Sequence, residues 1–574
     1  MLPEGFGGMI GWGVGATRRN ASRLNFLIGL VIVCFGLLLV RLAWISLVRG
    51  RPLAAKAVEQ RSVDAVIRLA RGPIFDRNME LLAGGTSIGL GGNLGEDCAA
   101  LAVAIFPQSI SGPGDSLDKL ERMIPGVLDG APRVIRLPGY DRKEIVGMAK
   151  AVTGIVPISI PSRWSGLASH VVGYLTGSQV GAEGIELAFE RFLGGGGQGR
   201  DVVRAMCDSR GKEIPGLGVR LAVAGEEPGW VRLSIDRRVQ EAVERAFDRR
   251  APGLAGAVVV MDPWTGQVMA MASRPSYDQN DVSSSLARAD APLLNRAVYP
   301  YYPGSIFKVV VAAAALNEGA RMPGSVYHDS GAIQAGGHTF RCHAFERGGH
   351  GDITFADAMA YSCNTAFVDA ALAVGPGPIV DAARALGIGS YEVAASTCLP
   401  NVSTGQTPPR QARMAAAELA NFALGQSVVK VTPLEVATMM CAVANDGILR
   451  HPTLVLEAVH SASGRVMKMD WEAARALDSG VASKLRSMLS GVVSYGTAQD
   501  ALGGRNAAGK TGTAQTGRVT ETGQPIYNAW FAGFAPADHP KVVISVLVEG
   551  AESGADLAAP IFGDICDEVL GFFG

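Results

Sequence analysis

One stretch, Pro303-Gly304-Ser305-Ile306-Phe307-Lys308, leads directly into the run 309–316, in which every residue is apolar. A helix that begins near Pro303 puts the Ser305 hydroxyl and the Lys308 amine on one face, because residues three apart are neighbours on a helix. A helix so uniformly apolar is expected in the interior. A serine becomes a nucleophile when a base takes its proton, and a lysine can be that base once its pKa is lowered. The stretch therefore predicts a rigidly held serine–lysine pair for acyl transfer.

The spacing of this pair is not specific by itself, because Ser-x-x-Lys also occurs at Ser116/Lys119, Ser209/Lys212 and Ser427/Lys430. Two further motifs complete a candidate site. Ser362-Cys363-Asn364 is the only Ser-x-Asn in the chain. Residues two apart do not share a helix face, so a turn must direct both polar side chains into one cleft. Lys510-Thr511-Gly512-Thr513 is expected on an edge strand, where Gly512 lets another backbone come close. Strict alternation leaves open how the lysine of this strand reaches the cleft.

The pattern around these motifs predicts one domain of helices and strands at residues 226–574. Strands are expected at 231–235, 257–261, 267–272, 529–535 and 542–548. Helices are expected at 237–249, 307–316 and 559–572. Strands at both ends of the region, with helices between them, indicate an α/β (α+β) fold.

An uncharged apolar run at 26–40 marks a membrane segment. With its flanks it reaches the length of about 20 residues that a spanning helix needs. Trp44 suits the interfacial belt beyond the run. We therefore expect a retained anchor at residues 23–48. The alternative is a cleaved signal peptide, for which Ala55-Lys56-Ala57 resembles a cleavage site, although it lies well beyond the run. Arginines on both sides leave the orientation open.

The composition excludes several other classes of protein. A formal net charge of −1 argues against a nucleic-acid partner, since phosphate binding needs a basic surplus. The 8 cysteines form no Cys-x-x-Cys pair, so neither a disulfide scaffold nor a cysteine-rich zinc module is indicated. The spacings within one His/Cys group fit no common zinc pattern: His338, Cys342, His343, His350 and Cys363. We expect an irregular loop near the cleft and no metal there, with a Cys342–Cys363 disulfide as an alternative.

Taken in this order, the Ser-x-x-Lys, Ser-x-Asn and Lys-Thr-Gly motifs make the chain similar to the class B penicillin-binding proteins. Further stretches carry the resemblance from the membrane segment to the C-terminus: 71–77, 181–186, 233–240, 295–297, 362–367 and 529–533. The family often has Gly-Gln-Gly where this chain has Gly425-Gln426-Ser427, which leaves the backbone of that loop open. The resemblance implies a penicillin-binding/β-lactamase-like transpeptidase domain at 226–574, with an antiparallel sheet flanked by helices.

The resemblance also implies the reaction. It is that of a serine-type peptidoglycan D,D-transpeptidase, which cross-links stem peptides through an acyl-enzyme and is inhibited by β-lactams, with no cofactor. The implied catalytic residues are Ser305, Lys308, Ser362 and Lys510. Ser305 would attack the carbonyl between two terminal D-alanines after Lys308 takes its proton, and Ser362 would relay a proton to the leaving D-alanine.

The implied substrate-binding residues are Asn364, Thr511, Gly512 and Thr513. Asn364 would hold the peptide amide, and the two threonines would bind the terminal carboxylate in the positive potential of Lys510. Backbone N–H groups of Ser305 and Thr513 would form the oxyanion hole.

The same resemblance implies the setting of the enzyme. It places a short cytoplasmic tail at 1–22, a single-pass anchor in the cell membrane, and an extended pedestal or dimerisation-like domain at 49–225, with the catalytic domain outside the cell. Expected partners are stem peptides, β-lactams and a multi-spanning glycan polymerase, but no nucleic acid. The alternatives are a D,D-carboxypeptidase, a serine β-lactamase, and a non-catalytic β-lactam receptor or scaffold. A role in elongation, division or sporulation stays open.

Overall fold

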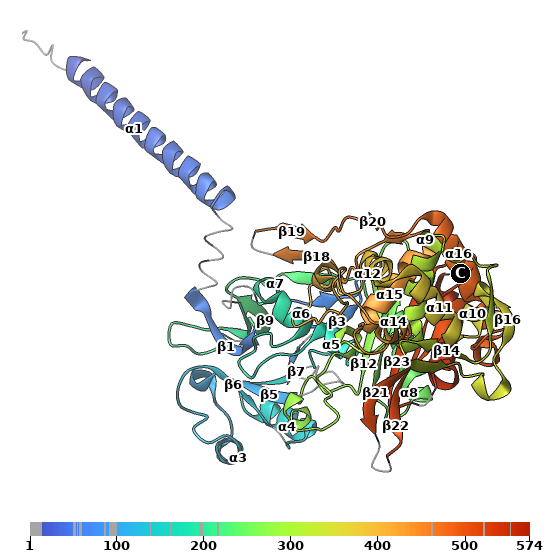
Figure 1. Cartoon of the computed structure of the whole chain (residues 1–574). Coiled ribbons are helices and arrows are strands. Elements are labelled where there is room, and N and C mark those ends of the chain that lie inside the picture. Colours follow the sequence, from blue (N-terminus) through green and yellow to red (C-terminus); the bar gives the residue numbers. More distant parts are fainter. Residues whose placement is uncertain are drawn as a thin grey trace, which may run out of the picture.

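The computed structural model describes residues 14–49, 53, 56, 60–84, 88–90, 100–137, 139–160, 162–194, 199–214, 217–460, 463–519, 523–551 and 553–573. Residues 1–13 of the expected tail lie outside them, as do Ala55 and Ala57 of the alternative cleavage site. The first helix, α1 (Val14–Leu47), stands apart from the folded body in Figure 1. Its stretch Arg23–Leu47 has 25 residues and is exposed, long and apolar enough to cross a membrane. The helix expected at 23–48 is therefore present, although it begins earlier, at Val14.

A five-stranded antiparallel sheet forms the centre of the C-terminal half, in the order β12-β11-β23-β22-β21. The strands are β11 (Gly256–Met261), β12 (Val268–Arg274), β21 (Ala508–Val519), β22 (Pro525–Ala535) and β23 (Val542–Glu549). They include four of the strands expected from the sequence, and the strand expected at 231–235 lies in another sheet. β21 is the edge strand that the Lys-Thr-Gly motif predicts. Helices α8 (Arg237–Arg250) and α18 (Ala559–Leu570) contact one another and the sheet, and α15 (Pro433–Ala444) and α16 (Ser479–Ser494) also pack on it.

The apolar helix behind the candidate nucleophile is central to a helical layer. This helix, α9 (Lys308–Asn317), contacts α11 (Asn364–Val374), α12 (Pro376–Ala385) and α16, and residues 308–316 are all buried. The interior position expected from its composition is confirmed. Other helices of this half are α10 (Phe355–Ala360), α13 (Tyr391–Ala395), α14 (Ala416–Ala423), α17 (Gln499–Leu502), η3 (Val282–Ser285), η4 (Arg296–Val298), η5 (Gly304–Phe307), η6 (Phe345–Arg347), η7 (Gly554–Ala558) and η8 (Gly571–Phe573).

Three two-stranded antiparallel sheets lie beside these helices. Their strands are β13 (Val326–Asp329) with β16 (Gly351–Thr354), β14 (Ala332–Ala335) with β15 (His338–Arg341), and β17 (Ile448–Leu449) with β20 (Ala474–Arg475). The sequence predicted an irregular loop around His338 to Cys363, and this segment instead contains β15, η6, β16 and α10. The expectation of an irregular conformation is therefore wrong, because short antiparallel strand pairs satisfy backbone hydrogen bonds in this segment.

The N-terminal half forms two further sheets (Figure 1). One joins β1 (Ser62–Leu69), β8 (Arg200–Met206) and β9 (Val219–Ala224), and the other joins β4 (Gly89–Leu90), β7 (Ile155–Ile160), β5 (Ala100–Ile105) and β6 (Arg133–Arg136). Its helices are η1 (Pro107–Ser109), α3 (Gly114–Met123), α4 (Arg142–Ala151), α5 (Ser169–Val172), α6 (Gly184–Ala188) and α7 (Glu190–Leu193). Apolar side chains of α3 and α4 pack against β5 and β7 in a core of their own.

A mixed sheet joins the two halves of the chain. Its order is β19-β18-β10-β2-β3, with β10 (Trp230–Leu233) parallel to β2 (Ile74–Phe75). The other strands are β3 (Leu81–Ala83), β18 (Val455–His460) and β19 (Arg465–Lys468). The backbone N–H of Arg77 donates to Ile235 O at 2.8 Å, and that of Arg237 donates to Asp76 Oδ2 at 3.1 Å. Two of the stretches that carry the family resemblance, 71–77 and 233–240, therefore meet in space.

Buried charges hold a second pair of these stretches together. Arg71 forms an ion pair with Glu186 and, at 2.8 Å, with Glu190, while Arg163 reaches Glu186 at 2.7 Å. The Glu186 side chain is fully buried, so its carboxylate depends on these arginines. An ion-pair network inside the protein thus connects the 71–77 and 181–186 stretches.

Candidate active site

Ser305 lies on the turn η5, immediately before α9. It is half-buried, and the neighbouring Gly304 has a φ of +54°. A Cβ on Gly304 would lie 2.7 Å from Thr513 O, so the backbone of β21 passes directly beside the nucleophile turn. The N–H of Gly304 donates to Gly425 O at 3.1 Å. Glycine at 304 is therefore required both by the φ angle and by the close approach.

The Lys308 amine connects the first two motifs. Its Nζ donates to Ser362 O at 2.7 Å and to Asn364 Oδ1 at 2.8 Å, and it lies 3.2 Å from Ser362 Oγ. Ser362 has a φ of +55°, a left-handed conformation that a non-glycine residue adopts only when its surroundings hold it there. This turn is how Ser362 and Asn364, two residues apart, both reach the same amine.

Burial changes the acid–base chemistry of two lysines. The Lys308 side chain is fully buried, and desolvation lowers its pKa to about 8. Lys510 is fully buried too, and desolvation and the charge of Lys308 hold its pKa well below the usual range. Two buried ammonium groups repel one another, so one of the two lysines can lose its proton near neutral pH. Lys308 therefore has the property that a general base for Ser305 needs.

The edge strand β21 brings the third motif to the same place. Lys510 Nζ donates to Thr511 O at 3.1 Å, so the side chain bends along its own strand toward the next residue. The sequence pattern left open how the side chain of Lys510 leaves its own face of the strand, and this bend is the answer. Thr511 is buried and Thr513 is exposed, and the Thr513 Oγ1 accepts from Gly554 N at 3.4 Å.

Gly512 sets the distance between β21 and the nucleophile turn. A Cβ at this position would lie 2.9 Å from Ile306 Cγ1 and 3.1 Å from Trp530 Cβ. A side chain at 512 would separate the strand from η5, as the sequence suggests for a glycine in an edge strand. The structure thus brings together Ser305, Lys308, Ser362, Asn364, Lys510, Thr511, Gly512 and Thr513.

The other Ser-x-x-Lys spacings do not form comparable pairs. Lys119 is exposed and forms an ion pair with Glu144 at 3.1 Å, and Lys212 is exposed in a turn. Lys430 lies over the ring of Tyr302. Ser427, at the departure from Gly-Gln-Gly, has a φ of +69°. The loop therefore keeps a glycine-like conformation although its third residue is a serine.

Sequence reasoning missed residues that support the motifs from outside them. The Thr497 Oγ1 lies 2.7 Å from Thr511 Oγ1, and the Thr497 N–H donates to Ala360 O at 3.0 Å. Thr365 Oγ1 donates to the buried carboxylate of Asp329 at 2.7 Å, behind the Ser362 motif. No spacing rule points to Thr497 or Asp329, because tertiary packing alone brings them to the site.

Comparison with known proteins identifies the class to which this fold and site belong. The sequence profile described as "Penicillin binding protein transpeptidase domain" matches residues 256–567. The chain belongs to the penicillin-binding protein transpeptidase family, and the resemblance to its class B members is confirmed.

Three similar proteins match from 60% to 96% of this chain. Stage V sporulation protein D of Bacillus subtilis is 27% identical over 96% of this chain and 85% of its own length. Peptidoglycan D,D-transpeptidase PbpA of Mycolicibacterium smegmatis is 35% identical over 60% of this chain and 74% of its own length. The crystal structure of penicillin binding protein 3 from Mycobacterium tuberculosis, complexed with aztreonam, has a TM-score of 0.62 and 25% identity, and covers 89% of this chain and 97% of that one.

Proposed function

We propose that the chain is a peptidoglycan D,D-transpeptidase that forms an acyl-enzyme at Ser305 and is inhibited by β-lactams. The observation that carries the proposal is the fully buried Lys308 amine, held at 2.8 Å by Asn364 Oδ1 and 2.7 Å by Ser362 O, one helical turn after Ser305. Such an amine is desolvated and fixed in place, and the spacing of three residues puts it on the same side of the turn as the Ser305 hydroxyl, as a lysine general base requires. The family membership and the names of the relatives support the same reaction.

In the proposed acylation step, the neutral Lys308 amine takes the Ser305 proton while Oγ forms a bond to the carbonyl carbon of the penultimate D-alanine. The tetrahedral oxyanion accepts hydrogen bonds from the backbone N–H groups of Ser305 and Thr513. When the C–N bond breaks, Ser362 passes a proton from Lys308 to the departing D-alanine nitrogen. The contact of 3.2 Å between Lys308 Nζ and Ser362 Oγ supports this relay.

We assign substrate binding to Asn364 and to residues of β21 in the same site. Asn364 holds the peptide amide, and Thr511 and Thr513 bind the terminal carboxylate. A bound carboxylate favours the charged form of Lys510, which then supplies positive potential. Gly512 keeps β21 close enough for these contacts. In the second half of the reaction an amine of another stem peptide attacks the ester carbonyl, which forms the cross-link and frees Ser305.

Labelling with benzylpenicillin tests the nucleophile. One serine should be acylated, and mass spectrometry of the labelled peptide should place the adduct on Ser305. Ser305→Ala should abolish labelling, while Ser427→Ala, the matched control in another Ser-x-x-Lys, should keep it. An adduct on any other serine would overturn both the site and the mechanism.

Turnover separates the enzymatic alternatives. With a stem-peptide donor and a D-amino acid acceptor, a transpeptidase should form the exchanged product in preference to the hydrolysed one. Hydrolysis alone would identify a D,D-carboxypeptidase, and rapid release of hydrolysed penicillin a serine β-lactamase. Stable labelling without turnover would identify a receptor or scaffold.

The setting of the enzyme belongs to the same proposal. We assign α1 as a single-pass anchor in the cell membrane, residues 1–22 to the cytoplasmic side, 49–225 to a pedestal, and 226–574 to the catalytic domain outside. A multi-spanning glycan polymerase is the proposed membrane partner. Protease added to intact spheroplasts should digest the catalytic domain, and its survival would contradict this topology. Replacing Leu24 to Val48 with an unrelated spanning helix should weaken co-purification with the polymerase if α1 is the contact.

A further inference from the structure

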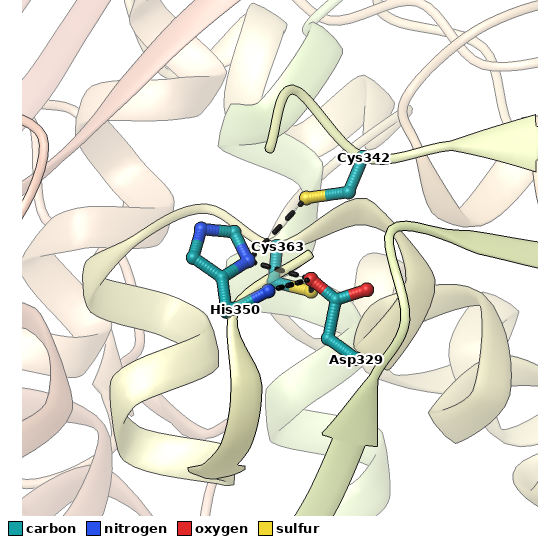
Figure 2. A group of neighbouring side chains, drawn as sticks. All are labelled: Asp329, Cys342, His350 and Cys363. Atoms are coloured by element: carbon teal, nitrogen blue, oxygen red, sulfur yellow. Dashed lines mark hydrogen bonds and ion pairs between the residues drawn. The ribbon is translucent and has the colours of Figure 1, made fainter. Parts of the chain in front are cut away.

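Four side chains with metal-binding atoms converge behind the Ser362 motif (Figure 2). Asp329 ends β13, Cys342 follows β15, His350 precedes β16, and Cys363 comes directly after Ser362. One ligand atom from each lies within 4.8 Å of those from the other three. Asp329, Cys342 and Cys363 are buried, and the His350 side chain is only 13% exposed. We call these four residues the Asp329 cluster.

We propose that the Asp329 cluster binds one zinc ion through the two cysteine thiolates, the His350 Nδ1 and an Asp329 carboxylate oxygen. Thiolate and imidazole ligands favour zinc over magnesium or calcium, which take oxygen ligands. Four protein ligands fill a tetrahedral coordination shell, as in structural zinc sites, and leave no position for substrate. The sequence analysis expected no metal here, and the inference reverses that expectation.

The contacts between the ligand atoms agree with a tetrahedral ion. Zn–S distances of about 2.3 Å and Zn–N or Zn–O distances of about 2.0–2.2 Å separate tetrahedral ligands by about 3.3–3.8 Å. Cys342 Sγ lies 3.6 Å from His350 Nδ1, and Cys363 Sγ lies 3.4 Å from Asp329 Oδ2. The His350 Nδ1 and Asp329 Oδ2 are closer, at 2.6 Å, where the proton of a hydrogen bond lies between them. Zinc would take the place of that proton and move these two atoms apart.

Other groups already hold the ligands in position. Asp329 accepts from Thr365 Oγ1 at 2.7 Å and from the N–H of Gly331 at 2.8 Å. The His350 ring stacks on Tyr361 with 5.5 Å between ring centroids and an interplanar angle of 6°. Partners of this kind fix the orientation of metal ligands and raise affinity. The four ligands also come from separate segments of the chain, so an ion would cross-link β13, the β15–β16 connection and the start of α11.

The location of Cys363 connects this site to catalysis. It lies between Ser362 and Asn364, the two residues that bind the Lys308 amine. Asn364 Nδ2 also donates to Arg341 O at 3.0 Å, next to Cys342. A zinc ion would therefore stabilise the left-handed turn at Ser362 from behind. The cluster members are positioning residues, since none touches the proposed substrate path.

Metal analysis of the full-length protein in detergent tests the binding. Mass spectrometry for metals should find about one zinc per chain. Cobalt added to metal-free protein should give the intense absorption of cobalt–thiolate bonds. Protein that holds no zinc and takes up neither ion would overturn the proposal. So would a Cys342–Cys363 disulfide found by peptide mapping without reductant, because it would consume two ligands.

Variants assign the ligands. Cys342→Ser and His350→Ala should each lower zinc content at least tenfold. Cys398→Ser, a free thiol elsewhere in the same domain, should keep it. His343→Ala is the sharper control, because the His343 Nδ1 lies 3.7 Å from Cys342 Sγ and yet is outside the cluster. Zinc lost in His343→Ala but kept in His350→Ala would overturn the ligand set. If the ligand variants do not fold, the cobalt spectrum of the unaltered protein still decides whether thiolates bind the metal.

The expected effect of zinc on catalysis rests on the proposed function. It is measured separately from metal binding, as the rate of acylation by benzylpenicillin. Removing zinc from the unaltered protein with a chelator should slow benzylpenicillin acylation at least fivefold, and added zinc should restore it. An unchanged acylation rate in zinc-free protein would contradict the positioning role. Zinc content should be the same in Ser305→Ala, which cannot be acylated. Failure of the Ser305 assignment would therefore leave the metal measurement intact.

Discussion

The hydroxyl oxygens of Thr497 and Thr511 lie 2.7 Å apart. Thr497 precedes α17 and belongs to none of the three motifs, yet it fixes the rotamer of a threonine that we assign to carboxylate binding. Thr497→Val keeps the shape and removes the hydrogen bond. We expect benzylpenicillin acylation to slow about five- to tenfold, since a hydrogen bond of this kind contributes about 1 kcal/mol.

Thr516→Val is the control for that measurement. Thr516 lies on the same strand, and its Oγ1 donates to Ile526 O at 2.8 Å, within the β21–β22 hairpin. It should leave the acylation rate unchanged. Equal losses in the two variants would show that strand stability, and not the orientation of Thr511, is being measured.

Acylation should depend on pH through Lys308. Burial lowers the pKa of this amine to about 8, so its neutral, proton-accepting form increases as the pH rises through that value. The acylation rate constant should increase about tenfold from pH 7 to pH 9. Lys308→Arg, which stays charged, should show almost no labelling at any pH. A rate that is flat or falls over this range would argue against Lys308 as the base.

Gly512→Ala should separate β21 from the nucleophile turn. The new Cβ would lie 2.9 Å from Ile306 Cγ1 and 3.2 Å from Pro303 O, and the backbone atom cannot rotate away. Acylation should fall at least tenfold, as measured by stopped-flow kinetics. Gly147→Ala is the control, because a Cβ at this position in α4 meets nothing within 4 Å. A Gly512→Ala enzyme with normal kinetics would show that the strand spacing is not critical.

The loop at Ser427 offers a test of backbone strain. A non-glycine residue in the left-handed region destabilises the folded protein by about 1–2 kcal/mol. Glycine avoids this strain, but it loses more backbone entropy on folding, which cancels part of the gain. Ser427 has a φ of +69°. Ser427→Gly should therefore raise the free energy of unfolding by about 0.5–1 kcal/mol. The measurement is the thermal midpoint of the purified protein.

The neighbouring glycine should respond in the opposite direction. Gly425 has a φ of +73°, and a Cβ there would lie 2.1 Å from Gly304 O. Gly425→Ala should lower both the thermal midpoint and the acylation rate. A destabilised Ser427→Gly protein would show that the serine side chain contributes more than its strain costs.

The local parts of the site were predictable from the sequence. Ser305, Lys308 and the apolar helix behind them form a contiguous stretch, and its periodicity and composition predict its burial. The need for a turn at Ser362 followed from the spacing of two residues, and the left-handed φ of +55° supplies it. The edge position of Lys510 followed from its strand pattern.

What the sequence could not supply comes from contacts between distant segments. Lys510 bends along its own strand to reach Thr511 O, which no alternation rule describes. Asp329 was not considered as a ligand, and it lies 34 residues from Cys363, which it contacts. Zinc patterns with short, regular spacings do not describe ligands that a folded domain gathers from several strands.

The pairing of β2 with β10 determines where the catalytic half can be cut from the rest. The predicted boundary at 225/226 falls just before β10, but the amide of Arg237, at the start of α8, has its acceptor on Asp76. A fragment that begins at residue 226 would have an open strand edge at β10 and would lose the Asp76 acceptor of the Arg237 N–H, although the N-cap Asp236 would remain. We therefore expect an isolated catalytic fragment to be more stable when it keeps residues 70–84, covalently or as an added peptide.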